Sequence, residues 1–398
     1  MSLTFKNAKV LWSGGFSQEP ISMSGDRIVD GNFKPIDLSG YLILPGIVDM
    51  HGDAFDHHIA PRPSAPLDIS LAFPRIDIEL ASNGITTAWL AKSWSWEGGR
   101  RSPEHAKEFA ELLDKYRLNS LTDLRLQLRC ETHTVDSLRD LLHSIKKFNI
   151  DYLVFNNHLS EAMAVLSKSD DAFAAWAAQV GKSFLEQKET VLRYNDIRNS
   201  EVHQYLLAIM EHVKKYDLVA GSHDDPDKKT RRYFSELGAK ICEFPLSIEA
   251  ANEAKRRNEP VLMGAPNVLR GGSQSGNIAA EDLIKNGLCD VLVSDYYYPS
   301  LYLAALKLVR ERVLTLEQSW DLISRNPARI MRLDDVGELA FGKRANMVIV
   351  DRSNMAIEAT VSKGKFAFVS GKFMDSFIFQ NIGISTVAAS KVAIRICI

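Results

Sequence analysis

Apolar and polar positions follow two rhythms along the chain, and the change between them predicts the domain organisation. Residues 1–45 and 336–398 contain short stretches in which apolar and polar side chains alternate between turns, a pattern typical of strands. From residue 46 to 335, apolar strand-like segments alternate with amphipathic helices, as in βα units around a parallel sheet. We therefore expect a central α/β domain and a small β-sandwich domain built from both chain ends, whose second part includes the C-terminal tail.

Two helices of the central region follow directly from apolar periodicity. Ser102 is a candidate N-cap, and Pro103 suits the first helical position. Apolar residues then recur at the spacing of one helix face, at Phe109, Leu112, Leu113 and Tyr116. The same spacing recurs at Leu138, Leu141, Leu142 and Ile145, directly before the strand-like residues 150–155. Strand thus follows helix, as a barrel of βα units requires.

Eight apolar segments of the central region predict eight strands. They lie near residues 47–50, 86–91, 124–130, 152–155, 218–221, 240–244, 261–264 and 291–294. This count predicts a (β/α)8 barrel of the TIM type, whose chemistry sits at the carboxyl ends of its strands. An open doubly wound sheet is the alternative, but no GxGxxG motif follows the first strand. Residues 160–215 are too long for one helix, so we expect an insertion of two or more helices that could form a lid.

Composition and charge narrow the classes of partner. The 398 residues are 45% hydrophobic with a formal net charge of -2, and acidic and basic residues are interspersed. We therefore expect a small-molecule partner rather than nucleic acid or a membrane surface. The four cysteines are scattered without a CxxC motif, and the sequence has neither an apolar signal segment nor a run of about 18 apolar residues. These features predict a cytoplasmic protein with reduced, buried thiols, and they leave a homo-oligomer open.

Residue types that bind metals stand where the predicted strands end. The first strand ends in His51 and Asp53, whose side chains point the same way because they are two positions apart. His158 follows the fourth strand, His223 the fifth and Asp295 the eighth. Each is weak evidence alone, because such residues often cap a strand or begin a turn. Their concentration at the rim where barrel enzymes do their chemistry indicates a metal site.

The third predicted strand carries a file of polar residues. Strict alternation places one set on a single face, namely Arg125, Gln127, Arg129 and Glu131. The leucines between them should meet the outer helices, so the polar file should line the barrel interior. Glu131 at the barrel mouth then needs a partner, either a metal ion or an ion pair with Arg129.

The order of these motifs resembles the amidohydrolase superfamily, whose barrels open with an HxH motif and close with a catalytic aspartate. The corresponding residues are His51-Gly52-Asp53 and Asp295. The likeness runs from about residue 45 to 350 and extends to the branch of diphosphatases that act on α-D-ribose 1-methylphosphonate 5-triphosphate in phosphonate metabolism. Besides the first motif, it rests on residues 58–63, 84–87, 128–131, 222–225, 263–267, 270–273 and 294–296.

The resemblance implies a centre of two divalent metal ions. It assigns His51, Asp53 and Asp295 to one ion, His158 and His223 to the other, and Glu131 to a bridge between them. Three histidines and three carboxylates suit zinc, with manganese or iron as alternatives. Our count puts the bridge and the two histidines one strand earlier than is usual in the superfamily, so either a strand is missing from the count or the bridge comes from a different strand.

The resemblance also implies a reaction. A metal-bridging hydroxide would attack the α-phosphorus of a ribose 5-triphosphate phosphonate ester, giving the 5-phosphate and pyrophosphate. Asp295 would orient the nucleophile and shuttle its proton.

Phosphate recognition should involve the loop after the seventh strand, where barrels often bind phosphate. The candidates there are Asn267, Arg270, Gly271, Gly272 and Ser273, and further candidates are Arg62 and Arg129. A flexible glycine turn and a surface arginine are the alternatives.

Two departures from the branch keep other functions open. Gln274 stands where related enzymes carry histidine, and residues 159–162 replace a segment containing glycine and arginine. Both changes remove possible phosphate donors, so an amidohydrolase that cleaves a C–N or ester bond of a cyclic amide or N-acyl amine is the alternative. A non-catalytic barrel with structural metals is a third hypothesis, although six ligands exceed what a structural zinc needs.

Overall fold

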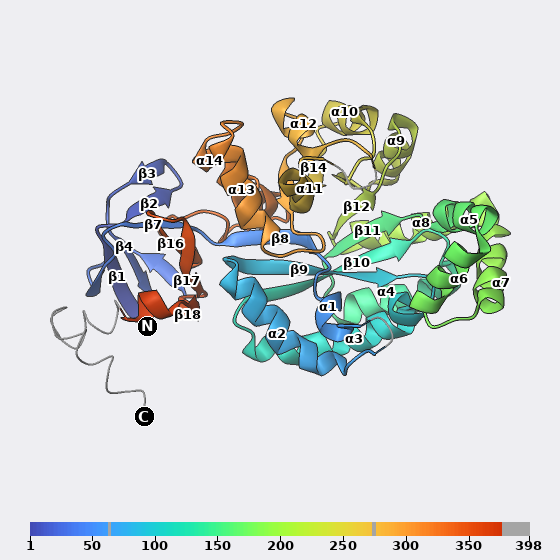
Figure 1. Cartoon of the computed structure of the whole chain (residues 1–398), viewed down its shortest axis with the longest axis horizontal. Coiled ribbons are helices and arrows are strands. Elements are labelled where there is room, and N and C mark those ends of the chain that lie inside the picture. The colour runs from blue at the N-terminus through green and yellow to red at the C-terminus, as the bar shows by residue number, and fades with distance from the viewer. Residues whose placement is uncertain (63–64, 273–275, 376–398) are drawn as a thin grey trace.

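We describe a computed structural model of the chain over residues 1–62, 65–272 and 276–375. Ser273 and Gln274 of the predicted phosphate loop lie outside the described residues, as does the tail beyond residue 375. In the described part, three sheets organise the chain, one of eight strands and two smaller ones (Figure 1).

The eight-stranded sheet is the predicted barrel. Its strands are parallel and neighbour one another in chain order. They are β8 (Ile47–Gly52), β9 (Ile85–Trp94), β10 (Asp123–Glu131), β11 (Tyr152–Asn156), β12 (Val219–His223), β13 (Ile241–Glu243), β14 (Val261–Gly264) and β15 (Val291–Val293). All eight predicted strands are present, so Glu131 does end the third strand, and the strand count needs no correction.

The barrel closes through a short seam between its first and last strands. Gly52 bridges Asp295, whose N–H donates to the carbonyl of His51 at 3.0 Å. A Cβ at Gly52 would lie 2.7 Å from Ser294 Oγ, so glycine alone fits this approach. The buried carboxylate of Asp49 accepts hydrogen bonds from Ser294 N and Oγ at 3.1 and 2.5 Å. The seam therefore brings the first predicted motif beside Asp295.

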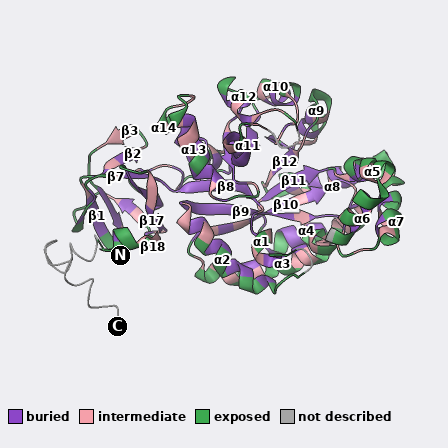
Figure 2. Ribbon diagram, in the orientation of Figure 1, coloured by how far each residue is buried: buried purple, intermediate pink, exposed green. Residues whose placement is uncertain are grey.

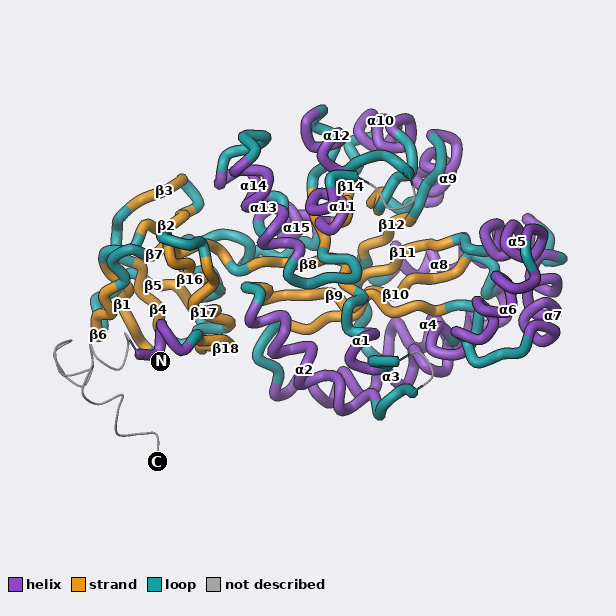
Figure 3. The backbone as a smooth tube through the Cα atoms, viewed as in Figure 1, coloured by secondary structure: helices purple, strands orange, loops and turns teal. Residues whose placement is uncertain are grey.

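Helices cover the outside of the barrel (Figure 3). They are α1 (Asp56–Ile59), α2 (Ile69–Ser82), α3 (Pro103–Tyr116), α4 (Leu138–Lys147), α9 (Lys228–Leu237), α10 (Ile248–Arg256), α11 (Ala265–Arg270), α12 (Ala280–Lys285), α13 (Ser300–Arg310) and α14 (Leu316–Asp321). The helix α15 (Arg325–Ile330) packs instead in a separate core with Val48 and Met50 of β8. Both helices predicted from periodicity are confirmed, and Ser102 caps α3 by accepting from the N–H of His105.

Burial follows the alternation predicted for the third strand. Leu126, Leu128 and Cys130 pack in the same apolar core as Phe109 and Leu141 of the covering helices. Buried residues concentrate along the barrel strands, while exposed residues gather on the outer helices (Figure 2). Among the described residues, no helix is both long and apolar enough to span a bilayer.

The predicted insertion is helical. After β11 the chain forms α5 (Leu159–Lys168), α6 (Asp170–Gln179), α7 (Phe184–Asn195) and α8 (Asn199–Lys215). The first three gather beyond the carboxyl ends of β10 and β11 (Figure 1). Their apolar faces form a separate core that contains Phe173, Val191 and Tyr194. Trp96, from the loop after β9, packs in the same core.

Both chain ends build the β-sandwich. One sheet has the order β5-β4-β1-β6 and the other β18-β17-β16-β7-β2-β3. Their strands are β1 (Ser2–Lys6), β2 (Lys9–Trp12), β3 (Gly15–Ser17), β4 (Ile21–Ser24), β5 (Arg27–Val29), β6 (Lys34–Asp37), β7 (Tyr41–Pro45), β16 (Met347–Asp351), β17 (Ala356–Ser362) and β18 (Lys365–Val369). Antiparallel pairing of β16 with β7 joins the two ends, and a core containing Phe5, Ile21 and Ile349 fills the space between the sheets. The boundaries after residues 45 and 335 remain our proposed division.

Candidate metal centre and active site

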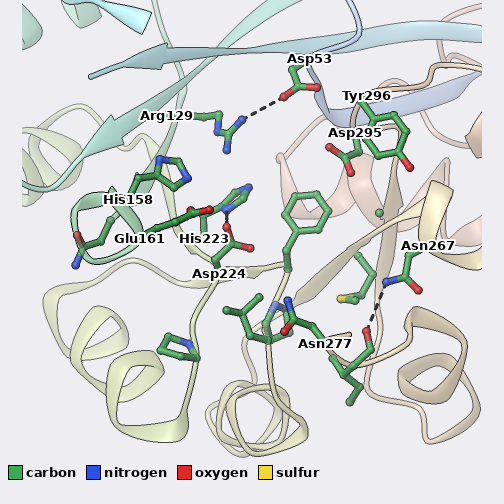
Figure 4. Close-up of a pocket in the computed structure, with 18 of the residues that line it drawn as sticks. Asp53, Arg129, His158, Glu161, His223, Asp224, Asn267, Asn277, Asp295 and Tyr296 are labelled. Atoms are coloured by element: carbon green, nitrogen blue, oxygen red, sulfur yellow. Dashed lines mark hydrogen bonds and ion pairs between the residues drawn. The ribbon is translucent and has the colours of Figure 1, made fainter. Parts of the chain in front are cut away.

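A cavity of about 920 Å³ opens at the carboxyl ends of the barrel strands (Figure 4). Eight of the residues predicted for the site line it, namely Asp53, Arg129, His158, His223, Asn267, Arg270, Gly272 and Asp295. Apolar side chains such as Phe155, Phe244 and Met263 form part of its wall. The cavity thus joins the candidate metal ligands to the described part of the predicted phosphate loop.

The first group of ligands forms at the barrel seam. His51, Asp53 and Asp295 each offer one ligand atom, and these atoms lie within 4.8 Å of one another. Burial, reinforced by the negative charge of Asp53, raises the pKa of Asp295 to about 6. Asp295 also adopts a φ of 56°, a left-handed conformation that aspartate tolerates better than most residues. Burial without a cation thus disfavours the charged carboxylate, and the seam holds this side chain at a fixed place on the rim.

Glu243 orients His51 from below. This carboxylate ends β13 in full burial, where its Oε2 lies 2.9 Å from His51 Nδ1 and its Oε1 accepts from Gln127 Nε2 at 2.9 Å and from the Tyr152 hydroxyl. A histidine that donates Nδ1–H to a carboxylate presents its Nε2 lone pair to a metal. Glu243 therefore fixes the tautomer in which His51 can act as a ligand.

The second group combines two predicted residues with Glu97, which follows β9. Ligand atoms of Glu97, Glu131 and His158 lie within 4.8 Å of one another. His158 Nδ1 is 2.6 Å from Glu131 Oε1 and 3.7 Å from Glu97 Oε1. Burial alone would lower the pKa of His158, but the two carboxylates raise it to about 10. This group therefore holds positive charge strongly, whether as a proton or as another cation.

His223 lies with the first group. Its ligand atom is within 4.8 Å of those of His51 and Glu243, and its ring centroid is 5.3 Å from that of His51. The resemblance implies that His223 shares a metal with His158, and that pairing stays a prediction. Burial lowers the pKa of His223, which favours the neutral imidazole that metals bind, and its Nδ1 lies 2.8 Å from Asp224 Oδ2.

Arg129 stands between the two groups (Figure 4). Its Nη1 donates to Asp53 Oδ2 at 3.2 Å, so its ion pair is with Asp53 rather than with Glu131. Arg62 is exposed, forms an isolated β-bridge with Ala65 and is not among the described residues that line the cavity. Gly271 does not line the cavity either; it is the C-cap of α11, in the left-handed conformation.

Comparison with known proteins places this barrel in a family. A sequence model of the amidohydrolase family matches residues 152–373. The chain belongs to the amidohydrolase family. It is also 30% identical over 345 residues to α-D-ribose 1-methylphosphonate 5-triphosphate diphosphatase of Escherichia coli strain K12, covering 84% of this chain and 90% of that enzyme.

Solved structures share the fold of this amidohydrolase. N-acetylglucosamine-6-phosphate deacetylase from Thermotoga maritima is 16% identical with a TM-score of 0.60, covering 92% of this chain and 100% of that chain. Dihydropyrimidinase from Brevibacillus agri is 13% identical with a TM-score of 0.61, covering 94% and 96%. These likenesses support the fold alone. Family membership makes the protein a metal-dependent hydrolase.

The donor set fits the divalent metals that amidohydrolases generally bind. Among the described residues, three buried ligand atoms have no hydrogen-bond partner, namely Glu131 Oε1, His158 Nδ1 and His223 Nδ1. The two histidine nitrogens lie close to carboxylate oxygens, but the geometry of these contacts is not that of a hydrogen bond. The lone pairs of these atoms are therefore available to a metal ion. Imidazole and carboxylate donors without thiolate suit zinc, manganese or iron.

Sequence reasoning missed Glu97 and Glu243. Glu243 does give a local signal, because it is the acidic residue of the apolar segment Ile241-Cys242-Glu243-Phe244 at a predicted strand end. Glu97 gives none, because it lies in a loop with no ligand spacing to its neighbours. Its approach to His158 depends on the tertiary fold.

Proposed function

We propose that this amidohydrolase hydrolyses a ribose 5-triphosphate phosphonate ester to the 5-phosphate and pyrophosphate. The observation that carries the proposal is a cavity in which the two ligand groups share a wall with Arg101, Arg129 and Arg270. Guanidinium groups suit phosphate oxygens, since they bind them through paired hydrogen bonds. The name of the Escherichia coli relative supports the same reaction.

The proposed centre uses residues from both groups. His51, Asp53 and Asp295 would hold one divalent ion, and His158 and His223 the other, with Glu131 between them. Such ions, when bound, supply positive charge at the phosphate and water that ionises near neutral pH. The Asp295 carboxylate, held at the seam beside His51 and Asp53, accepts the proton of the attacking water. Arg129 and Arg270 orient the phosphate chain so that the α-phosphorus faces this water and pyrophosphate leaves.

Cleavage of a C–N or ester bond is the second candidate. Glu161 and Asp224 also line the cavity, and Glu161 lies at the start of α5, in the segment that departs from the phosphonate branch. Two extra carboxylates repel a polyphosphate and favour a less charged substrate.

Product assays distinguish the two reactions. Metal-loaded protein should release pyrophosphate from a ribose 5-triphosphate, and the Asp295→Asn variant should not. Turnover of lactams or N-acyl amines by the wild type, without pyrophosphate release, would overturn the diphosphatase proposal in favour of the second candidate.

The proposed location, partner and metal rest on separate observations. Cys130, Cys242 and Cys289 are buried free thiols, which supports the proposed cytoplasmic location. We propose a small phosphorylated molecule as the partner, with zinc as the first metal to test. Self-association stays a prediction for solution measurements.

A further inference from the structure

Glu97 is a buried carboxylate that the proposed six-ligand centre does not use. It is 1% exposed, and its two oxygens have different surroundings. Oε2 accepts from Arg101 Nη1 at 2.7 Å, whereas Oε1 accepts from Ser95 Oγ at 3.1 Å and faces His158 Nδ1 at 3.7 Å. Arg101 therefore occupies one side of the carboxylate and leaves the other directed at the second group.

The inserted helices fix this carboxylate in place. Its backbone carbonyl accepts from Lys182 Nζ at 3.1 Å and from the buried Gln187 Nε2 at 3.4 Å. The neighbouring Trp96 packs against Tyr194 of α7, with ring centroids 5.4 Å apart, and the backbone N–H of Trp96 donates to Thr134 Oγ1 at 3.2 Å. The loop after β9 is thus held from two sides, so Glu97 is preorganised rather than free to turn away.

We propose that Glu97 is a ligand of the second cation, together with Glu131 and His158. Three ligand atoms from three different segments lie within 4.8 Å of one another, close enough to share an ion. Glu131 is 2% exposed, and within the described chain its Oε1 has no hydrogen-bond partner. Arg101 balances only one of these two buried carboxylates, so the group favours a further positive charge, which a divalent cation would supply when His158 is neutral.

This inference rests on the two-metal centre of the proposed function and changes its composition. One imidazole and two carboxylates form a harder donor set than the two histidines implied by the resemblance. Oxygen-rich sites favour manganese more than nitrogen-rich sites do. The second position should therefore accept Mn²⁺ as well as Zn²⁺.

Metal titration of Glu97→Gln tests the inference without reference to any substrate. Chelator-stripped protein would be titrated with Zn²⁺ and separately with Mn²⁺, and bound metal counted by mass spectrometry after buffer exchange. We expect wild type to bind two equivalents and Glu97→Gln to lose the second, or to bind it at least about tenfold more weakly. His158→Gln should lose the same equivalent.

Arg101→Gln is the matched control, because it removes the ion pair but keeps the carboxylate. If Glu97 served only to pair with Arg101, the two variants would lose metal alike, and that result would overturn the proposal. Retention of both equivalents by folded Glu97→Gln would overturn it as well. Should Glu97→Gln fail to fold by circular dichroism, Glu97→Asp retracts the ligand atom with the charge kept, and the same loss is expected.

The titration separates this inference from the proposed reaction. Two equivalents in Glu97→Gln would remove Glu97 from the centre and leave the diphosphatase proposal standing. A single equivalent in the wild type would overturn the two-metal centre itself.

Discussion

Glu243→Gln tests whether the barrel interior prepares His51 for a metal. Glu243 accepts hydrogen bonds from His51 on one oxygen, and from Gln127 and Tyr152 on the other. Glutamine keeps the shape but offers a single acceptor oxygen. With that oxygen toward His51, its amide group faces two donors. In the other orientation its amide faces Nδ1 and moves the imidazole proton to Nε2, where it blocks the metal-binding lone pair.

The size of the effect follows from the bonds that are lost. Either orientation removes at least one charge-assisted hydrogen bond, worth about 1.5–3 kcal/mol. Since about 1.4 kcal/mol is a factor of ten in an equilibrium constant, affinity for the first cation should fall about 10- to 100-fold. Tyr152→Phe is the matched control, because it removes another donor to the same carboxylate while the charge and the His51 contact remain. We expect it to change affinity by less than about threefold.

Competition between the stripped protein and a coloured chelator for Zn²⁺ measures these affinities, and circular dichroism checks the fold. Wild-type affinity in folded Glu243→Gln would refute the reasoning, because His51 would then bind its ion without the tautomer that Glu243 sets. An equal loss in both variants would also refute it, because disturbance of the barrel interior would then suffice.

Three further variants test the role of Asp295 in catalysis, the contribution of Asp77 to stability and the effect of His105 on the pH dependence of stability. Asp295→Asn should abolish turnover while the protein keeps bound metal, so substantial activity in metal-replete protein would contradict the role of Asp295. Asp77→Ala should lower the free energy of unfolding by about 1–3 kcal/mol in urea titrations, because the buried backbone N–H of Thr122 would lose its acceptor; a loss under about 0.5 kcal/mol would contradict this. Burial and nearby cationic charge lower the pKa of His105 from 6.5 to about 4, so the unfolded state binds the proton first and stability should fall as pH drops through this window. His105→Gln should flatten that decline in urea midpoints between pH 7 and 4.5, and an unchanged slope would count against this assignment.

The sequence predicted the barrel because its strands are buried on both faces and its helices are amphipathic. A continuous apolar run such as residues 152–155 is typical of a buried parallel strand, and the apolar stripe beginning at Phe109 is typical of an amphipathic helix. Residues at strand ends were predictable for the same reason, since parallel strands deliver them to one rim.

What escaped prediction depends on contacts between elements. Glu97 reaches His158 only because the insertion holds its loop, and Glu243 acts through partners on three other strands. The closeness of the His223 ring to that of His51 is a further contact that spacing along the chain does not encode. Arg62 was a candidate for phosphate recognition, but its side chain is exposed and is not among the described residues that line the cavity.

The seam of the barrel gives the metal a mechanical role. Asp49 and Ser294 are 245 positions apart, yet they bond across the line where the first strand meets the last. The first ligand group spans this line, so a bound ion ties together two ends of a very long chain segment. Only the folded chain brings these ligands together, so a bound ion would stabilise the closed barrel by mass action and offset part of the entropy lost when so long a loop is closed. The first ligand group is therefore complete only when the last strand of the barrel lies beside the first.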